Sequence, residues 1–178
     1  MTMKKIINIA PEGYRIILYT LAIWFSTYIF SVLSNYSWLE LLSIYMFYLL
    51  LMVCYFFRDP IRSISGGDSS FLSPADGRII SIEDYNDIHI GKSTKIAIFL
   101  SVLNVHRQWT PLSGKVINTL YNPGKFFGAF KDKASDKNEQ TSILFQDYKK
   151  NTFKIKQIAG FVARRIVNHM NVDLNVNQ

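Results

Sequence analysis

The apolar residues of this chain are concentrated at its amino-terminal end. No charged residue occurs at positions 16–39 or at positions 41–57, whereas polar and charged residues crowd the remainder. A helix needs about 20 apolar residues to cross the hydrocarbon core of a bilayer, so each run is close to spanning length. The second run is slightly short, and Glu40 at its edge can reach the headgroups. We therefore expect two transmembrane helices joined by a tight turn around residues 34–37.

Two other interpretations of these runs are weaker. A helix pair buried in a soluble core would need far more polar chain to cover it than this protein has. A cleavable signal peptide is disfavoured, because the apolar run is too long and no small-residue cleavage site precedes the second run. We therefore assign residues 1–57 to a transmembrane helical hairpin.

Cations flank the two runs on one side only. Lys4, Lys5 and Arg15 precede the first run, Arg58 and Arg62 follow the second, and the connecting turn has no Lys or Arg. The positive-inside rule then places both ends of the hairpin in the cytoplasm. We expect the protein in the inner (cytoplasmic) membrane, with residues 58–178 forming a domain that faces the cytoplasm.

The part of the chain after residue 57 is basic. Three of the 20 Lys and Arg and two of the 13 Asp and Glu precede residue 58, which leaves this part with a net charge of +6. A basic domain beside a cytoplasmic leaflet is attracted to anionic lipid by about 1 kcal/mol per cation. Nucleic acid is the competing partner for a basic chain, but no recognition helix, finger or aromatic–basic repeat occurs. The only cysteine, Cys54, lies inside the second run, so we expect no disulfide and no thiol metal site.

Residues 58–178 have a strand-like pattern. A Ser/Gly-rich stretch at residues 61–72 predicts a flexible linker, and five β-rich runs follow it, at residues 78–82, 95–100, 115–121, 142–146 and 152–158. The second run is nearly all apolar, which predicts a buried strand. Residues 126–135 are compatible with one short helix. The expected fold class is therefore a membrane-anchored α+β protein, in which the two-helix hairpin precedes a mainly β domain.

Three short motifs have simple structural interpretations. The sequence GKST at residues 91–94 is similar to the end of a phosphate-binding loop, but the glycine required five positions earlier is Asn86 and a strand follows, so a hairpin turn suffices. SPADG at residues 73–77 suits a type I turn. NPG at residues 122–124 suits a type II turn in which Gly124 supplies the positive φ.

The order of five motifs carries more information than each motif alone. They are SPADG at 73–77, LSVLNVHRQWTP at 100–111, YNPGKFF at 121–127, DKAS and NE within 132–139, and IAGFVARRIV at 158–167. Their order and spacing resemble the phosphatidylserine decarboxylase family, particularly its short bacterial form, over roughly residues 58–167. An amino-terminal hairpin is also usual for that form.

The resemblance implies an enzyme of phospholipid biosynthesis that makes its own cofactor. A proenzyme of this family cleaves itself before the serine of a Gly-Ser sequence near its carboxyl end, and the serine becomes a pyruvoyl group on a separate small chain. The pyruvoyl carbonyl condenses with the amine of phosphatidylserine and accepts electrons as carbon dioxide leaves. The product is phosphatidylethanolamine.

The same resemblance nominates site residues. Asp76 and His106 are the candidate catalytic residues: Asp76 would orient and stabilise a histidine during self-cleavage, because a carboxylate favours the charged imidazolium. His106 is the only histidine in its motif and is the candidate for proton transfer. Lys125, Phe126 and Phe127 are candidate substrate-binding residues, with the cation near a lipid phosphate and the rings in the interface. His89 and His169 are expected to be ordinary packed or exposed side chains.

The chain also departs from the family pattern. It contains no Gly-Ser dipeptide, so the pyruvoyl group is not formable from these residues, and residues 168–178 are polar and unlike the family's continuation. Gln108 and Trp109 stand where the short form has Asn and Arg, and Gln140 stands where it has Arg; planar cations that bind carboxylate or phosphate are thereby lost.

We therefore expect residues 58–178 to be an incomplete decarboxylase domain, truncated before the cleavage site and inactive by itself. The alternatives from other classes are an inactive membrane protein that binds anionic phospholipid, and a non-functional gene fragment.

Overall fold

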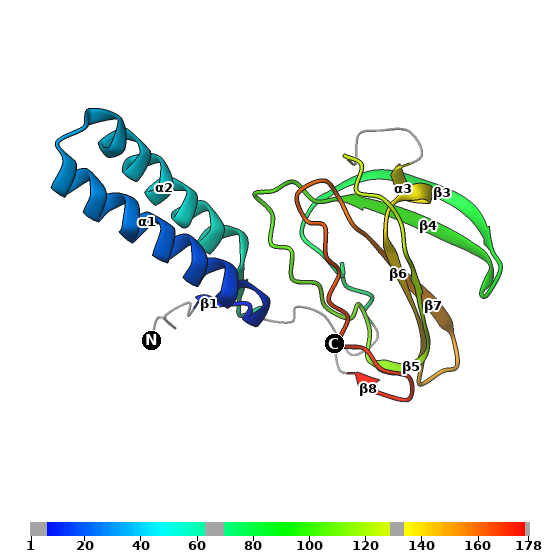
Figure 1. Ribbon diagram of the computed structural model, residues 1–178. Helices are drawn as coiled ribbons and strands as arrows, with labels where there is room; N and C mark the ends of the chain where they lie inside the picture. The colour runs from blue at the N-terminus through cyan, green and yellow to red at the C-terminus, as the bar shows by residue number, and fades with distance from the viewer. Residues whose placement is uncertain (1–6, 63–69, 129–133, 177–178) are drawn as a thin grey trace. The chain divides into compact units, whose positions relative to one another are not determined.

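The structure divides into two compact units with an α+β composition. This computed structural model describes residues 7–62, 70–128 and 134–176 (Figure 1). One unit comprises Met1–Ser63 together with Leu103–Gln108, and the other comprises Ile64–Val102 and Trp109–Gln178. The functional division after residue 57, into membrane and cytoplasmic parts, stays a prediction.

Two long apolar helices form most of the first unit. A short 3-10 turn, η1 (Pro11–Gly13), leads into α1 (Tyr14–Ser34), and α2 (Ser37–Phe56) follows after a two-residue connection. Asn35 ends α1 in the left-handed conformation, with φ of 53°, as a helix C-cap commonly does. The predicted tight turn is thus confirmed.

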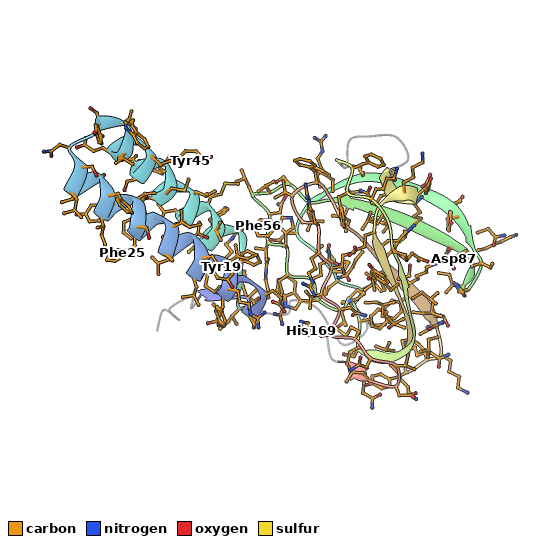
Figure 2. All side chains as sticks on the ribbon, in the orientation of Figure 1. Tyr19, Phe25, Tyr45, Phe56, Asp87 and His169 are labelled. Carbon is orange, nitrogen blue, oxygen red and sulfur yellow. The ribbon has the colours of Figure 1, made fainter. Side chains whose placement is uncertain are left out.

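Apolar side chains surround both helices. Tyr19, Phe25 and Tyr45 project away from the helix pair with more than half of their surface exposed (Figure 2). Both helices are long and apolar enough to cross a membrane. A helix that is apolar all round normally lies in a large core or in lipid, and two helices alone provide no such core.

The segments that enter and leave the hairpin run side by side. Strand β1 (Ile7–Ile9) pairs antiparallel with β2 (Arg58–Pro60), and the Ala10 N–H donates to the carbonyl oxygen of Phe57 at 2.8 Å. Both ends of the hairpin therefore emerge at the same end of the helix pair.

The second unit is built from an antiparallel ribbon and an antiparallel sheet. The ribbon pairs β3 (Arg78–Asp87) with β4 (Gly91–Phe99). The sheet has the order β7-β6-β5-β8. Its strands are β5 (Gly114–Asn122), β6 (Gln140–Asp147), β7 (Thr152–Ile158) and β8 (Asn175–Val176), and the short helix α3 (Ala134–Lys137) precedes β6.

One face of the sheet carries the hydrophobic core. Val116, Ile143, Phe145 and Val176 are buried there. Ile143 and Phe145 are two residues apart on β6 and so point to the same face of the sheet. The ring of Phe145 stacks on that of Phe153, its cross-strand partner, with centroids 5.0 Å apart. Alternation along the strands thus defines the core face.

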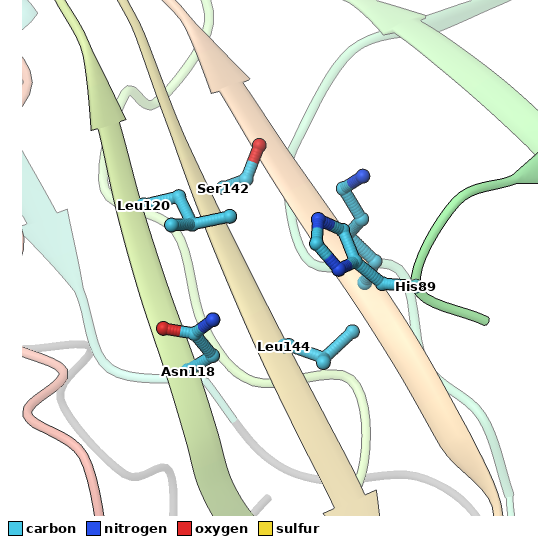
Figure 3. Close-up of a pocket in the computed structure, with 6 residues that line it drawn as sticks. His89, Asn118, Leu120, Ser142 and Leu144 are labelled. Atoms are coloured by element: carbon cyan, nitrogen blue, oxygen red, sulfur yellow. The ribbon is translucent and has the colours of Figure 1, made fainter.

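The ribbon is fixed to the sheet by a largely buried ion pair. The Lys154 ammonium on β7 donates to Asp87 at the end of β3 at 2.5 Å, and the Asp87 carboxylate also accepts from the His89 N–H at 2.8 Å. Burial alone would raise the pKa of Asp87, but these bonds and the lysine's charge outweigh it, and the pKa is lowered. His89, Ser142 and Leu144 help to line a cavity of about 10 Å³ nearby (Figure 3), which offers space for about one water molecule.

The five predicted strands are confirmed, and the first four of them are longer than expected. The GKST motif belongs to a hairpin, as expected, but the turn lies at residues 88–90 and Gly91 opens β4 with φ of 74°. The expected linker at residues 61–72 falls largely on residues 63–69, which lie outside the described part of the chain.

Two other predictions about residues 58–178 are wrong. The run at residues 95–100 is not buried: Ile96 is 53% exposed and Phe99 38%. An apolar run is buried only where another layer packs on it, and no described element covers this part of the ribbon's outer surface. The short helix was expected over residues 126–135, but among the described residues it is Ala134–Lys137, and Phe126 and Phe127 are not helical; residues 129–133 lie outside the described part of the chain.

The core face yields a stability prediction. Phe145 is 1% exposed and Tyr148, just beyond the same strand, is 75% exposed. Phe145→Ala should lower the free energy of unfolding by about 3–5 kcal/mol, because it removes a buried ring and leaves a cavity. Tyr148→Ala should change it by less than about 0.5 kcal/mol. Denaturant titration of the full chain in detergent, followed by circular dichroism, measures both; equal effects would contradict the assignment of the core.

Candidate functional site

The SPADG motif is held against a segment more than 30 residues further along the chain. The Trp109 N–H donates to the carbonyl oxygen of Pro74 at 2.9 Å, and the Leu72 N–H donates to that of Pro111 at 2.9 Å. The motif is a series of bends that leads into β3, and Asp76 within it is half-buried. The SPADG motif therefore lies beside the end of the second motif, Trp109 to Pro111, in the second unit.

Gly77 explains why this motif ends in glycine. Its φ is 154°, and a Cβ placed there would come within 2.5 Å of the carbonyl oxygen of Phe99 on the paired strand. A side chain would displace the two strands at the start of the ribbon. The glycine thus lets the bend that carries Asp76 approach β4 closely.

His106 lies in the first unit, at the end of α2. Its imidazole packs on the ring of Phe56 with centroids 4.3 Å apart, and its Nδ1 lies 3.0 Å from the carbonyl oxygen of Asn104. Because a carbonyl oxygen only accepts, Nδ1 carries the proton of the neutral ring and Nε2 keeps its lone pair. A neutral imidazole with Nε2 as its basic atom is a suitable proton acceptor.

The environment of His106 favours this neutral form. Burial lowers the pKa of His106 and the positive charge of Arg58 lowers it further, while the bond to Asn104 acts in the opposite direction; the net pKa is below 6.5. At neutral pH the ring is therefore mostly uncharged.

Arg58 joins the histidine segment to the helix. Its guanidinium donates to the carbonyl oxygens of Tyr55 and Leu103, each at 2.7 Å, and stacks 3.7 Å from the centroid of the Tyr55 ring. Arg58 thus caps the end of α2 and at the same time holds a loop 45 residues away. The sequence pattern had assigned it only a role in membrane orientation.

The two candidate catalytic residues are positioned by different units. The bends before β3 place Asp76, and the end of α2 places His106. Their pairing during self-cleavage stays a prediction.

Lys125, Phe126 and Phe127 are organised by a buried amide, Asn138. Asn138 is 2% exposed; its Nδ2 donates to the carbonyl oxygens of Phe127 and Ala159, and its Oδ1 accepts from the Phe127 N–H, all at 2.8 Å. The Lys125 ammonium lies 5.6 Å from the centroid of the Phe127 ring. Sequence reasoning recorded Asn138 only as part of a motif and missed this role.

The expected conformation of Gly124 is wrong. Its φ is outside the left-handed region. A glycine is needed for a different reason: a Cβ would lie 2.4 Å from the backbone of Asn138 and of Glu139. Close approach of two backbones, rather than a turn, accounts for this residue.

The positions that depart from the family pattern are also placed. Gln140 begins β6 between Asn122 and Ile158, and its Oε1 is buried without a hydrogen-bond donor among the described residues. The backbone N–H of Trp109 donates to the carbonyl oxygen of Pro74, as described above. Gln108 belongs to the first unit.

Two hollows and the possible metal ligands can be assessed in the part of the chain that the structure describes. The cavity beside His89 is too small for a lipid headgroup. An open groove of about 450 Å³ lies between α1 and α2, lined by Trp24, Tyr28, Ser43, Ile44, Phe47 and Tyr48. Within the described ranges, no three His, Cys, Asp or Glu side chains gather as a metal ion would require.

The structure thus joins an apolar two-helix hairpin to a mainly β unit, and His106 lies at the end of the second helix. These features define the class of protein. The family model described as phosphatidylserine decarboxylase matches residues 49–178. The chain belongs to the phosphatidylserine decarboxylase family.

Individual relatives agree with this assignment. The chain is 40% identical to the phosphatidylserine decarboxylase proenzyme of Nitratidesulfovibrio vulgaris over 90% of this chain and 71% of the relative. It is 40% identical to that of Ehrlichia ruminantium over 99% and 76%. It is 44% identical to that of Burkholderia ambifaria over 67% and 56%.

The expectation that residues 168–178 are unlike the family is wrong. The family model matches through residue 178. The Asp173 N–H donates to the carbonyl oxygen of Val116 at 2.9 Å, and β8 pairs with β5 and adds Val176 to the core. Polar composition concealed two apolar residues, Met170 and Val176, that pack on the sheet.

The environment of His106 yields a titration prediction. Phe56→Ala should expose the imidazole and raise the pKa of His106 towards its ordinary value, because burial is the larger cause of the shift. The measurement is the pH dependence of diethylpyrocarbonate modification, read by mass spectrometry of the His106 peptide. The exposed His169 in the same digest serves as the reference, and an unchanged His106 profile in Phe56→Ala would contradict the prediction.

Proposed function

We propose that this chain supplies the membrane hairpin and the acid–base residues of a phosphatidylserine decarboxylase, which converts phosphatidylserine to phosphatidylethanolamine. Family membership supports the reaction, and the placement of His106 at the end of α2 is the structural observation that carries the proposal. A lipid headgroup lies at a membrane surface, and a base attached to the end of a membrane helix is positioned at that depth.

Asp76 and His106 have different roles in the proposal. His106, with a basic Nε2, accepts or delivers a proton during self-cleavage or turnover. Asp76 stabilises an imidazolium at the self-cleavage step. Lys125 contacts the lipid phosphate while Phe126 and Phe127 lie at the interface, and the family's small chain, made from the same proenzyme, completes the enzyme.

The pyruvoyl group of the family, when formed, supplies a carbonyl that accepts electrons from the substrate. These 178 residues hold no Gly-Ser dipeptide from which the group could arise. The residues present therefore do not fit the cofactor, and the 178-residue polypeptide by itself is proposed to be inactive.

A second candidate function is binding of anionic phospholipid without catalysis. Trp109 and Gln140 stand where the resemblance predicts arginines, and the buried, unsatisfied Oε1 of Gln140 does not replace a planar cation, which disfavours catalysis. The net charge of +6 after residue 57 supports binding of anionic lipid without it. One experiment distinguishes the two functions. If a pyruvoyl-forming sequence is added, turnover is expected for the decarboxylase and not for the lipid-binding protein.

The membrane arrangement is part of the same proposal. α1 and α2 span the inner membrane, and both ends of the hairpin lie in the cytoplasm. Support comes from the length and apolar surface of the helices, from the cations flanking them, and from the pairing of β1 with β2 at one end.

The activity prediction compares the chain with an extended version. The 178-residue chain should keep its intact mass and should not convert labelled phosphatidylserine. Appending a family carboxyl segment with its Gly-Ser after residue 178 should permit cleavage into two chains, and is necessary for turnover. Conversion of the lipid by the unextended chain would contradict the proposal.

In the extended chain, His106→Ala should lower cleavage or turnover by about 10²-fold or more, the usual contribution of a general acid or base. Asp76→Asn should slow cleavage. His169→Ala and Asp84→Asn, both at exposed positions, are the matched controls. If the extended wild-type chain cleaves but does not turn over, the lipid-binding function is favoured.

The topology prediction uses reporter fusions. A reporter fused after Gln178 should be active if it functions in the cytoplasm and inactive if it functions only in the periplasm. A fusion at Asn35, between α1 and α2, should give the opposite result. Periplasmic activity at the carboxyl end would contradict the arrangement.

A further inference from the structure

The loop that follows β7 holds two apolar side chains out in solvent. β7 ends at Ile158, and the next residue, Ala159, is buried. Beyond it Phe161 is 63% exposed and Val162 is 58% exposed. Adjacent exposed apolar side chains on a short loop are a common feature of binding surfaces.

Hydrogen bonds within the loop fix this presentation. The Gly160 N–H donates to the carbonyl oxygen of Ala163 at 2.9 Å, and the Arg164 N–H donates to that of Val162 at 3.0 Å. The Arg164 Nε–H donates to the carbonyl oxygen of Phe161, also at 3.0 Å. A loop that is already folded loses little conformational entropy when it binds.

The base of the loop is anchored to the sheet. The Ala159 N–H donates to the carbonyl oxygen of Glu139 at 2.8 Å, and the Ala159 carbonyl accepts from the buried Asn138. The base of the loop is therefore anchored by a buried side chain of the sheet, in addition to the hydrogen bonds within the loop.

The tip is also cationic. The Arg164 guanidinium lies 5.3 Å from the centroid of the Phe161 ring and 5.9 Å from that of Phe126, on the neighbouring loop. Residues 121–128 and 159–167 together contain Lys125, Arg164 and Arg165 and no acidic residue. Arginine heads beside exposed rings match the phosphates and the acyl boundary of an anionic bilayer surface.

We propose that the tip formed by Phe161, Val162, Arg164 and Arg165 docks into the surface of an anionic bilayer. Phe161 and Val162 enter the boundary between headgroups and acyl chains, while the two arginines bind lipid phosphates. The docking brings the second unit onto the membrane by a contact separate from the helical hairpin. This inference rests on the proposed membrane function, because it assumes that α1 and α2 hold the chain at the bilayer.

A lipid surface fits these residues better than a protein partner does. The loop presents two adjacent exposed apolar side chains beside the cationic head of Arg164. Lipid headgroups adapt to such a shape, whereas a protein would need a matching concave and acidic surface. A second copy of the chain is an outcome that the test distinguishes.

The experiment uses the full chain in vesicles, with single cysteines introduced into a Cys54→Ala background. Phe161→Cys reports the loop tip, Phe25→Cys reports the hairpin, and Tyr148→Cys is the exposed control on the β6–β7 turn. Each carries the same fluorophore, and spin-labelled lipid is the quencher. Vesicles contain phosphatidylcholine alone or phosphatidylcholine with phosphatidylglycerol, and circular dichroism checks that each variant is folded.

The expected result is quenching of the label at position 161 in anionic vesicles, less in neutral vesicles, and none at position 148. Each of Arg164→Gln and Arg165→Gln should lower the docked population by about fivefold, the factor expected for one cation at an anionic surface. Added salt should weaken the docking in the same direction.

Three outcomes would overturn the inference. One is no quenching at position 161 while position 25 is quenched, which leaves the membrane hairpin intact. Another is equal quenching at position 161 in neutral and anionic lipid. The third is protection of position 161 from an aqueous quencher in detergent without lipid, which would assign the loop to a contact between copies. Absence of quenching at position 25 would instead refute the proposed membrane function.

Discussion

The buried amide of Asn138 is the constraint on which the arrangement of the candidate lipid-facing loops depends. It binds the backbone of Phe127 through two hydrogen bonds and that of Ala159 through a third. A buried backbone group left without its partner costs about 1–3 kcal/mol, so this side chain strongly favours one arrangement of the two loops. Gly124 permits it, because any larger residue would strike the backbone of Asn138. The loop of residues 160–165 and the segment of Lys125 to Phe127 are consequently held in one arrangement by the same side chain.

A second group of contacts joins His106, the candidate base, to the end of α2. Arg58 closes α2 and holds the carbonyl oxygen of Leu103, and Phe56 covers the imidazole of His106. The same residues that end the helix also keep the histidine neutral, through burial and a neighbouring positive charge. The position of the base at the end of α2 and its protonation state therefore have a common physical origin.

Family membership and the chemistry of these 178 residues are separate matters. The family model matches residues 49–178, a range that includes the bend that carries Asp76 and the histidine segment. The reaction of that family also needs a keto carbonyl that can form a Schiff base, which no encoded side chain provides, and these residues contain no Gly-Ser source for it. The Oε1 of Gln140 is buried without a hydrogen-bond donor among the described residues, at a position where the resemblance predicts an arginine.

The sequence by itself determined the two helices, five of the strands and the family, because each depends on local periodicity or on motifs with fixed spacing. The tertiary structure alone decided which apolar segments are buried: residues 95–100 are as apolar as a core strand, yet Ile96 is exposed because no described layer covers it. It also decided the purpose of Gly124, the partners of Asn138 and the packing of His106 on Phe56, since those contacts join residues 11 to 50 positions apart. Polar composition hid the packing of residues 170 and 176 for the same reason: burial is a property of the neighbours that folding brings together, and these are not encoded in the local pattern.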